Sequence, residues 1–294
     1  MFFGIAFIAA DAFAVPITFV GHNAVADIPE ALLLMGFGVA IGIIGTLIGA
    51  GGGFLHVPML MIMYNFSPQH AIGTSIAVVF LNALSGTFSY MAQKKIDYEI
   101  GLKFSVVAVP GVFIGAAAAQ SFSLFSFSIV FGLFLLVLSY FLLTEMKLNL
   151  VRKRVEDSPE TRILQDASGE VYHYAPDMPV GLFASFFVGI VSGLFGIGGG
   201  IIHVPLMYSV LGVPVHLATA ISHFILAITA FFGMLCFIGL HQVDMSFAML
   251  LGIGTILGAY YGARLSLKTH PRVIKKIVAF CLFLLSMKLL FSAI

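Results

Sequence analysis

Charge is the scarcest property of this 294-residue sequence: only 9% of its residues are Asp, Glu, Lys or Arg, against about 25% in an ordinary soluble domain. The sequence has no tryptophan and only two cysteines, which form no CxxC motif, so a disulfide framework and a thiolate metal or redox site are excluded. It also lacks the Gly-x-x-x-x-Gly-Lys-Ser/Thr loop that binds ATP phosphates. The formal net charge of +1 does not indicate a basic surface for nucleic-acid binding.

Apolar residues make up 60% of the sequence and gather in long runs. A helix that crosses a bilayer needs about 20 of them. The runs that approach this length are 31–48, 71–91, 104–120, 124–143, 180–197, 217–240, 247–263 and 273–291. The sequence therefore predicts an all-α polytopic membrane protein, with most of the chain in lipid.

Residues 1–30 form an extra N-terminal segment with three open interpretations. The run from Phe2 to Val20 is apolar but contains Asp11 and Pro16. No Lys or Arg precedes it, and the following sequence, Ala24–Ala26, resembles a cleavage site. A cleaved signal peptide, an additional span and an interfacial helix all fit this pattern.

The rest of the chain contains one sequence unit twice. Gly49–Pro58 (GAGGGFLHVP) recurs 147 residues later as Gly196–Pro205 (GIGGGIIHVP), and the same register holds along both units. We predict transmembrane repeats at 31–144 and 178–294, joined by a hydrophilic cytoplasmic linker at 145–177. The linker is expected to be solvated, and a regulatory or lipid-head-group-binding segment is the alternative.

Basic residues occupy opposite loops in the two units. Lys94-Lys95 in the first unit corresponds to the weakly charged His241-Gln242 in the second, whereas the uncharged Ser121–Ser123 corresponds to Lys268–His270. Because cytoplasmic loops attract Lys and Arg, equivalent loops are expected on opposite sides of the membrane. This predicts two inverted repeats of about five helical segments each; four parallel spans per unit is the alternative.

The glycine motif of each unit predicts a broken or short helix. Only about a dozen residues separate it from a loop that contains Pro68 or Pro214, and at 1.5 Å per residue they span about 18 Å of a core about 30 Å thick. A helix that begins inside the membrane presents unpaired N–H groups and the positive end of its dipole, which suit an anion. Close helix packing over the glycines is the alternative.

Polar residues inside the predicted spans complete the candidate site. Apart from Asp11, the carboxylates lie in or beside predicted loops, so no span offers an acidic ring for cations. Any single Ser or Thr can instead bond to its own helix. The candidate substrate-binding residues are Gly51, Gly52, Gly53, His56, Thr74, Ser75, Asn82, Gly198, Gly199, Gly200, His203, Thr219, Ser222 and His223.

Three roles are open for the histidine side chains. His56 and His203 are matched by the repeat, whereas His223 corresponds to Ile76. They can act as proton carriers, as helix-packing donors or as metal ligands. Because a zinc site usually needs three or four protein ligands, two matched histidines argue against a metal, and we expect no metal and no cofactor.

The sequence resembles the TauE/SafE family of sulfite and sulfonate exporters, also called TSUP transporters. The resemblance rests on Gly49–Pro58, Ala71–Ser75, Asp97, Gly196–Pro205 and Ala218–Ser222. It implies a secondary transporter of sulfur-containing oxyanions in the cytoplasmic (inner) membrane. By the same resemblance, Gly51–Gly53, Ser75, Gly198–Gly200 and Ser222 are the binding positions. The histidine before each Val-Pro departs from the apolar residue common in the family.

We therefore expect a secondary transporter and not an enzyme. Its partners would be a small anionic substrate, the lipid bilayer and a coupling proton or ion. The rivals are a metal-handling protein or membrane enzyme that uses the three histidines, and an anion channel. The substrate, the direction of transport and the presence of a homo-oligomer stay open, because outward helical faces are apolar whether they meet lipid or another subunit.

Overall fold

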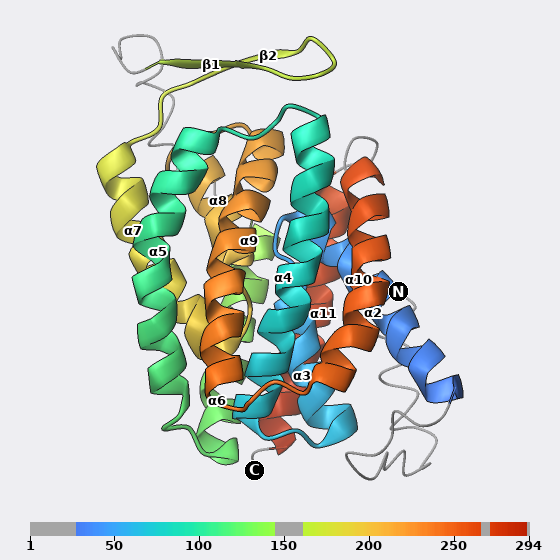
Figure 1. Cartoon of the computed structure of the whole chain (residues 1–294). Helices are drawn as coiled ribbons and strands as arrows, with labels where there is room; N and C mark the ends of the chain where they lie inside the picture. Colours follow the sequence, from blue (N-terminus) through green and yellow to red (C-terminus); the bar gives the residue numbers. More distant parts are fainter. Residues whose placement is uncertain (1–27, 145–160, 266–270, 293–294) are drawn as a thin grey trace.

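The structure, a computed structural model, describes residues 28–144, 161–265 and 271–292 (Figure 1). Nearly all of the N-terminal segment 1–30 lies outside the described residues, so its three interpretations stay open. The described part contains ten helices and one two-stranded hairpin. The helices form one bundle, and the hairpin lies across one end of it (Figure 1).

Each predicted repeat contains five helical segments. Those of the first repeat are α2 (Ile28–Ile48), α3 (Gly53–Tyr64), α4 (Pro68–Ala92), α5 (Tyr98–Ala119) and α6 (Leu124–Thr144). Those of the second are α7 (Met178–Phe195), α8 (Gly200–Ser209), α9 (Val215–Gly239), α10 (Met245–Leu265) and α11 (Pro271–Ser292). Among the described helices, seven are long and apolar enough to cross a membrane, and α11 adds the shorter apolar stretch 278–291. The predicted all-helical polytopic fold is confirmed, while the inversion of the repeats stays a prediction.

Side-chain caps determine where several helices begin. Asp97 Oδ1 accepts hydrogen bonds from the N–H groups of Glu99 and Ile100 at the start of α5, at 3.1 and 3.2 Å. The matched Asp244 caps α10 in the same way. Aspartate is among the best N-caps because its carboxylate pairs N–H groups that have no acceptor within the helix. The Asp shared by both repeats is therefore a structural signal.

Helix contacts follow the repeat. α2 packs on α10 while its counterpart α7 packs on α5, and α4 and α6 each pack on their own counterparts, α9 and α11. Glycines allow the closest of these contacts. A Cβ atom on Gly111 would lie 2.9 Å from the backbone nitrogen of Ile190, and one on Gly258 would lie 2.9 Å from that of Ile43. Backbones thus approach one another at equivalent places in both repeats.

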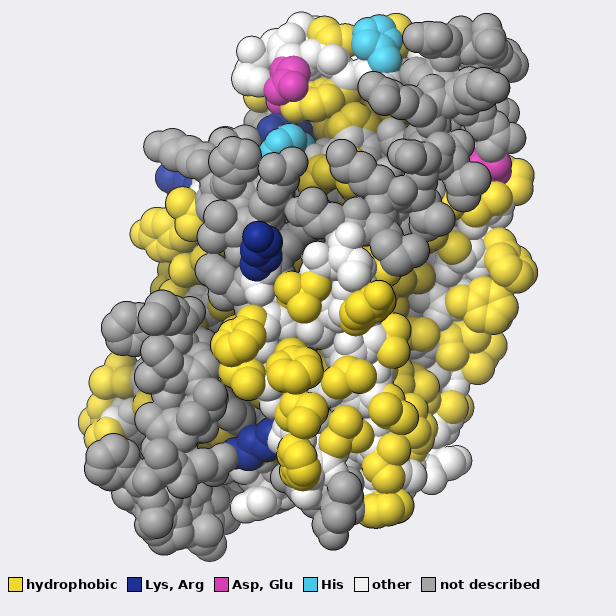
Figure 2. Space-filling model, turned by 180° about the vertical axis from the view of Figure 1, so that it is seen from behind, with side chains coloured by type: hydrophobic (Ala, Val, Ile, Leu, Met, Phe, Trp, Pro, Cys, Tyr) yellow, Lys and Arg dark blue, Asp and Glu magenta, His cyan; other side chains and the backbone are white. Residues whose placement is uncertain are grey.

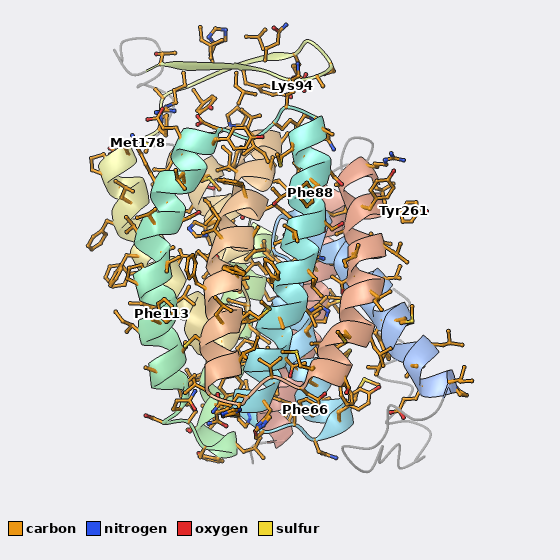
Figure 3. The ribbon with its side chains drawn as sticks, in the orientation of Figure 1. Phe66, Phe88, Lys94, Phe113, Met178 and Tyr261 are labelled. Carbon is orange, nitrogen blue, oxygen red and sulfur yellow. The ribbon has the colours of Figure 1, made fainter. Side chains whose placement is uncertain are left out.

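The helices present an apolar outer surface, as lipid requires. Figure 2 shows apolar side chains over the exposed helical faces, with the visible acidic and histidine side chains toward the hairpin end. Phe113 and Tyr261 lie at the margins of the bundle in Figure 3, and Phe88, Phe113 and Tyr261 are 61%, 43% and 59% exposed. A surface of this kind is unfavourable in water and is matched by hydrocarbon.

The basic loop of the first repeat and the hairpin share one end of the bundle. Figure 3 places Lys94, after α4, and Met178, at the start of α7, toward this end, and Phe66, before α4, toward the other. A common cytoplasmic side for the basic loop and the linker is consistent with this placement.

Part of the predicted linker is an ordered β-hairpin, which the sequence analysis did not anticipate. Strand β1 (Arg162–Gln165) pairs antiparallel with β2 (Val171–Tyr174), and Arg162 lies opposite Tyr174. The side chains of both residues reach Asp97: the Tyr174 hydroxyl donates to its Oδ2 at 2.7 Å, and Arg162 Nη1 lies 3.1 Å from the same atom. The hairpin is therefore bound to the start of α5.

Further contacts hold the hairpin against the second repeat. Lys95 Nζ lies 3.6 Å from Asp166 Oδ2, and Tyr172 and Tyr174 pack among apolar side chains that include Met207 and Leu217. Burial, together with the bond to Asp97, raises the pKa of the Tyr174 hydroxyl above its usual value. The hairpin thus links the α4–α5 loop to the ends of α8 and α9.

Asp97 combines a cap with an ion pair, whereas Asp244 has no ion pair among the described residues. Asp97→Asn keeps the cap, since asparagine caps as well as aspartate, but loses one of the two carboxylate charges that face Arg162; the other is that of Glu99. We expect Asp97→Asn to lower the unfolding temperature in detergent. Asp97→Ala should lower it further, because loss of the cap alone removes about 1 kcal/mol. Asp244→Asn is the control and should unfold like the wild type; equal lowering by both Asn variants would contradict a stabilising hairpin contact.

Asp166 makes the hairpin sensitive to acid. Its Oδ1 accepts hydrogen bonds from the Ser168 hydroxyl at 2.6 Å and from the N–H groups of Ser168 and Glu170. The Ser168 hydroxyl contributes most to lowering the pKa of Asp166 from 3.8 to about 2, against the opposing effect of burial. A group whose pKa is lower in the folded state stabilises the fold above its unfolded pKa and loses that contribution as the pH falls to the folded value.

We therefore expect hydrogen exchange of the β1 and β2 amides, corrected for intrinsic rates, to increase as the pH falls from about 4 to about 2. Asp166→Asn should reduce this pH dependence, because the asparagine amide does not take up a proton in this range. The remainder belongs to Glu99, because protonation of its carboxylate weakens the ion pair with Arg162 of the hairpin. Mass spectrometry of the peptides that span the hairpin measures both proteins. The same acid dependence in wild type and variant would show that another group controls docking.

Candidate functional site

Both glycine motifs interrupt a helix, as predicted. α2 ends at Ile48 and α3 begins at Gly53, and α7 ends at Phe195 while α8 begins at Gly200. The interruptions use matched positive φ angles: 83°, 67° and 83° at Gly49, Gly51 and Gly52, and 68°, 74° and 77° at Gly196, Gly198 and Gly199. Residues with a Cβ atom rarely adopt this conformation. The motif is therefore glycine-rich because the chain turns there.

The two interruptions lie against each other. A Cβ atom on Gly53 would collide with the carbonyl of Gly196 and lie 2.8 Å from the Cα of Ile197. Reciprocally, a Cβ on Gly200 would collide with the carbonyl of Gly49. The beginnings of α3 and α8 are thus in contact across the two repeats, and the glycines of both motifs are buried.

The first N–H groups of the two short helices are free in the part of the chain that the structure describes. Leu55 and His56 donate to the Gly52 carbonyl, but the N–H groups of Gly52, Gly53 and Phe54 have no acceptor. The N–H groups of the matched residues Gly199, Gly200 and Ile201 likewise have none. Free donors at the positive ends of helices attract anions.

The matched serines connect the repeats. Ser75 Oγ donates to the Gly196 carbonyl at 2.9 Å, and Ser222 Oγ donates to the Gly49 carbonyl at 3.0 Å. Each also lies near the first carbonyl of the short helix in its own repeat, at 3.4 Å from Gly53 and 3.5 Å from Gly200. Because a hydroxyl has one hydrogen to donate, each serine in this conformation holds the opposite interruption. A direct substrate contact stays a prediction.

The hydroxyl and amide groups of the other candidate residues also form hydrogen bonds within the protein. Asn82 donates from Nδ2 to the Gly42 carbonyl at 3.3 Å and accepts from Thr46 Oγ1 at 3.0 Å, which binds α4 to α2. Thr74 Oγ1 accepts from the N–H of Asp244. Thr219 Oγ1 donates to the carbonyl one turn earlier in its own helix. Thr74 and Thr219 thus lie on central helices but bond to protein.

The three histidines are buried and have different surroundings. His203 Nε2 lies 3.2 Å from Ser185 Oγ. His223 has one nitrogen 3.2 Å from the Thr219 carbonyl, and its ring contacts Tyr90 edge to face at 5.3 Å. His56 is 0% exposed, and neither of its ring nitrogens has a partner among the described residues. Within those residues no three His, Cys, Asp or Glu side chains gather to hold a metal ion.

Sequence reasoning missed the polar residues that distinguish the two repeats. Thr46 bonds to Asn82, yet its counterpart 147 residues later is Gly193. Ser185 bonds to His203, and its counterpart is Gly38. A search for polar residues that break the repeat would have found both.

Comparison with known proteins identifies relatives along nearly the whole chain. A sequence model of the family described as sulfite exporter TauE/SafE matches residues 34–289. The probable membrane transporter protein YunE of Bacillus subtilis is 34% identical over 270 residues, which cover 90% of this chain and 98% of that protein. A probable membrane transporter protein of Haemophilus influenzae is 27% identical, over 85% of this chain and 92% of its own length. No solved structure matches the chain significantly.

These matches agree with the seven apolar helices long enough to span a membrane in the described part. The family and the relatives are named as membrane transporters and not as enzymes. The match extends over both helix interruptions and over parts of all ten described helices. The chain therefore belongs to the sulfite exporter TauE/SafE family of multi-pass membrane transporters.

Proposed function

We propose that this transporter moves small sulfur-containing oxyanions, such as sulfite or organosulfonates, as a secondary transporter of the cytoplasmic (inner) membrane. One observation carries the proposal. Two short helices, one from each repeat, begin side by side in a buried place, and the first N–H groups of both have no acceptor among the described residues. Donors that are fixed before the anion arrives stabilise it without reorganisation. Sulfite and sulfonate groups each present several acceptor oxygens to such donors.

The distribution of charge supports an anionic substrate. The acidic residues of the described helices, Glu30 and Glu99, lie in the first turns of α2 and α5. No carboxylate from the described helices therefore neutralises the positive helix ends at the interruptions. The C-termini of α2 and α7 also end at the interruptions, but the carbonyls of Gly49 and Gly196 there already accept hydrogen bonds from Ser222 and Ser75. The N–H groups at the start of α3 and α8 disfavour a cation.

Alternating access is the mechanism we propose, with the two repeats inverted. Exchange of the repeats preserves the helix contacts and the serine bonds between the interruptions. The motif glycines are buried in this conformation, so an anion reaches them only after helices move. Relative movement of two matched units around a fixed central site is a common way to open it to each side in turn.

We infer the energy source for transport from the sequence. No ATP-binding loop is present in the sequence, so a proton or ion gradient, or the substrate gradient itself, would drive transport. A channel would carry the same anions but only downhill.

Uptake by proteoliposomes tests the proposal. Purified full-length protein is reconstituted, and accumulation of radiolabelled sulfite, taurine, sulfoacetate and acetate is measured with and without a pH gradient. We expect sulfite or a sulfonate to accumulate against its own electrochemical gradient, which a channel cannot achieve. Flux that never exceeds equilibrium would favour the channel, and no flux of any of the anions would contradict the proposed substrate class.

Glycine substitutions test whether the anion passes the two helix interruptions during transport. Gly53→Ala and Gly200→Ala would each push one interruption away from the other, since the added Cβ meets backbone atoms. We expect either change to reduce uptake about fivefold or more, as strain of about 1–3 kcal/mol would do. Gly36→Ala is the matched control, because nothing lies within 4 Å of a Cβ on Gly36. Equal uptake by all three variants would remove the interruptions from the pathway.

Serine substitutions separate a structural role from a binding role. Ser75→Ala and Ser222→Ala each leave a buried carbonyl with one bond fewer, which costs about 1–3 kcal/mol. We expect both to lower the unfolding temperature in detergent by similar amounts. Ser89→Ala serves as control, because Ser89 bonds only to the carbonyl of Ser85 in its own helix. A Ser75→Ala protein of unchanged stability that no longer binds sulfite would instead indicate direct contact with the anion.

A further inference from the structure

His56 and His203 occupy equivalent positions but have different partners. Each lies one turn after its glycine motif and donates its backbone N–H to the residue that caps its short helix, Gly52 or Gly199. The side chain of His203 reaches Ser185 Oγ on α7 at 3.2 Å. The side chain of His56 is fully buried, and neither of its nitrogens has a partner in the described part of the chain.

The packing of α2 on α10 causes this difference. The residue of α2 that corresponds to Ser185 is Gly38. A Cβ atom on Gly38 would collide with the Leu251 carbonyl and lie 3.1 Å from the backbone nitrogen of Thr255. Thr255 Oγ1 also donates to the Gly38 carbonyl at 3.2 Å. A side chain that could bond to His56 therefore has no room at this position.

The unpartnered imidazole lies at the interruption of the first repeat. A Cβ atom on Gly52 would be 3.3 Å from His56 Cε1. The ring is therefore beside the peptide whose N–H group, with those of Gly53 and Phe54, has no acceptor. An unpaired polar side chain in a buried place is unfavourable unless a ligand or a water molecule pairs it. A free imidazole donor next to free amide donors is a suitable set for an oxyanion.

We propose that His56 contacts the transported anion directly and determines its affinity, whereas His203 is a positioning residue that holds α8 to α7. This inference rests on the proposed function and deepens it, because it makes the two halves of the site unequal. An imidazole N–H of His56 donates to an oxygen of a sulfite or sulfonate group at the start of α3. The second repeat contributes backbone donors at the start of α8.

Binding and thermal unfolding of full-length protein in detergent test this assignment together. Radiolabelled sulfite is equilibrated with wild type and with His56→Leu, His56→Gln and His203→Leu. We expect His56→Leu to bind sulfite about tenfold more weakly, as loss of one hydrogen bond to a charged group implies. His56→Gln should recover most of the affinity, because its amide also donates. The loss in His203→Leu should be at least about threefold smaller than that in His56→Leu.

The unfolding temperatures provide the readout that a purely structural histidine would not give. His56→Leu replaces an unpaired buried ring by an apolar side chain and should unfold at or above the wild-type temperature. His203→Leu leaves Ser185 without its partner and should unfold below it. Ser185→Ala is the control for the lost pair and should also unfold below the wild type.

Two results would overturn the assignment. One is equal loss of affinity in His56→Leu and His203→Leu, and the other is an unchanged affinity in His56→Leu. Failure of the proposed function is distinct from both, because it appears as a wild-type protein that binds none of sulfite, taurine, sulfoacetate and acetate. That outcome would overturn both proposals.

Discussion

A peptide group that lacks a partner inside a bilayer has to be enclosed by protein, and the rest of this structure depends on that constraint. Two helices are interrupted, and each interruption is covered by the other: Gly53 lies on the Gly196 peptide and Gly200 on the Gly49 peptide. Close contact requires glycine, and the carbonyls turned away from the helices are bonded by hydroxyls from α4 and α9. The N–H donors at the start of α3 and α8 have no acceptor among the described residues, and we propose that the anion pairs them.

The two repeats share a backbone design and differ in their polar side chains. The matched features are the glycine turns, the serine bonds between the interruptions and the aspartate caps. The unmatched features are the hydrogen bond between Thr46 and Asn82 in the first repeat and that between Ser185 and His203 in the second. The two repeats thus share one backbone arrangement, and a few unmatched polar residues give them different side-chain contacts.

Local sequence patterns predicted most of the fold and the positions of the helix interruptions. The apolar runs, the basic loops and three consecutive glycines act over short distances, so composition and spacing reveal them. The partner of Ser75 is a carbonyl 121 residues away, and no local pattern indicates it. The hairpin was missed because its strands are four residues long, lie in a polar linker and are held by a distant Asp97. Contacts with a substrate depend also on the size and chemistry of that substrate, and the amino-acid sequence does not encode them.

The central claim is that free amide groups at the interruptions bind the anion, and one labelling experiment addresses such an amide directly. The sequence contains two Gly–Phe pairs, Gly36–Phe37 and Gly53–Phe54. Protein with carbonyl-labelled glycine and nitrogen-labelled phenylalanine therefore gives two selected amide signals in a nuclear magnetic resonance spectrum. Addition of sulfite should shift the Phe54 signal, at the start of α3, and leave the Phe37 signal, within α2, in place. A Phe54 signal that does not move at saturating sulfite would contradict the account.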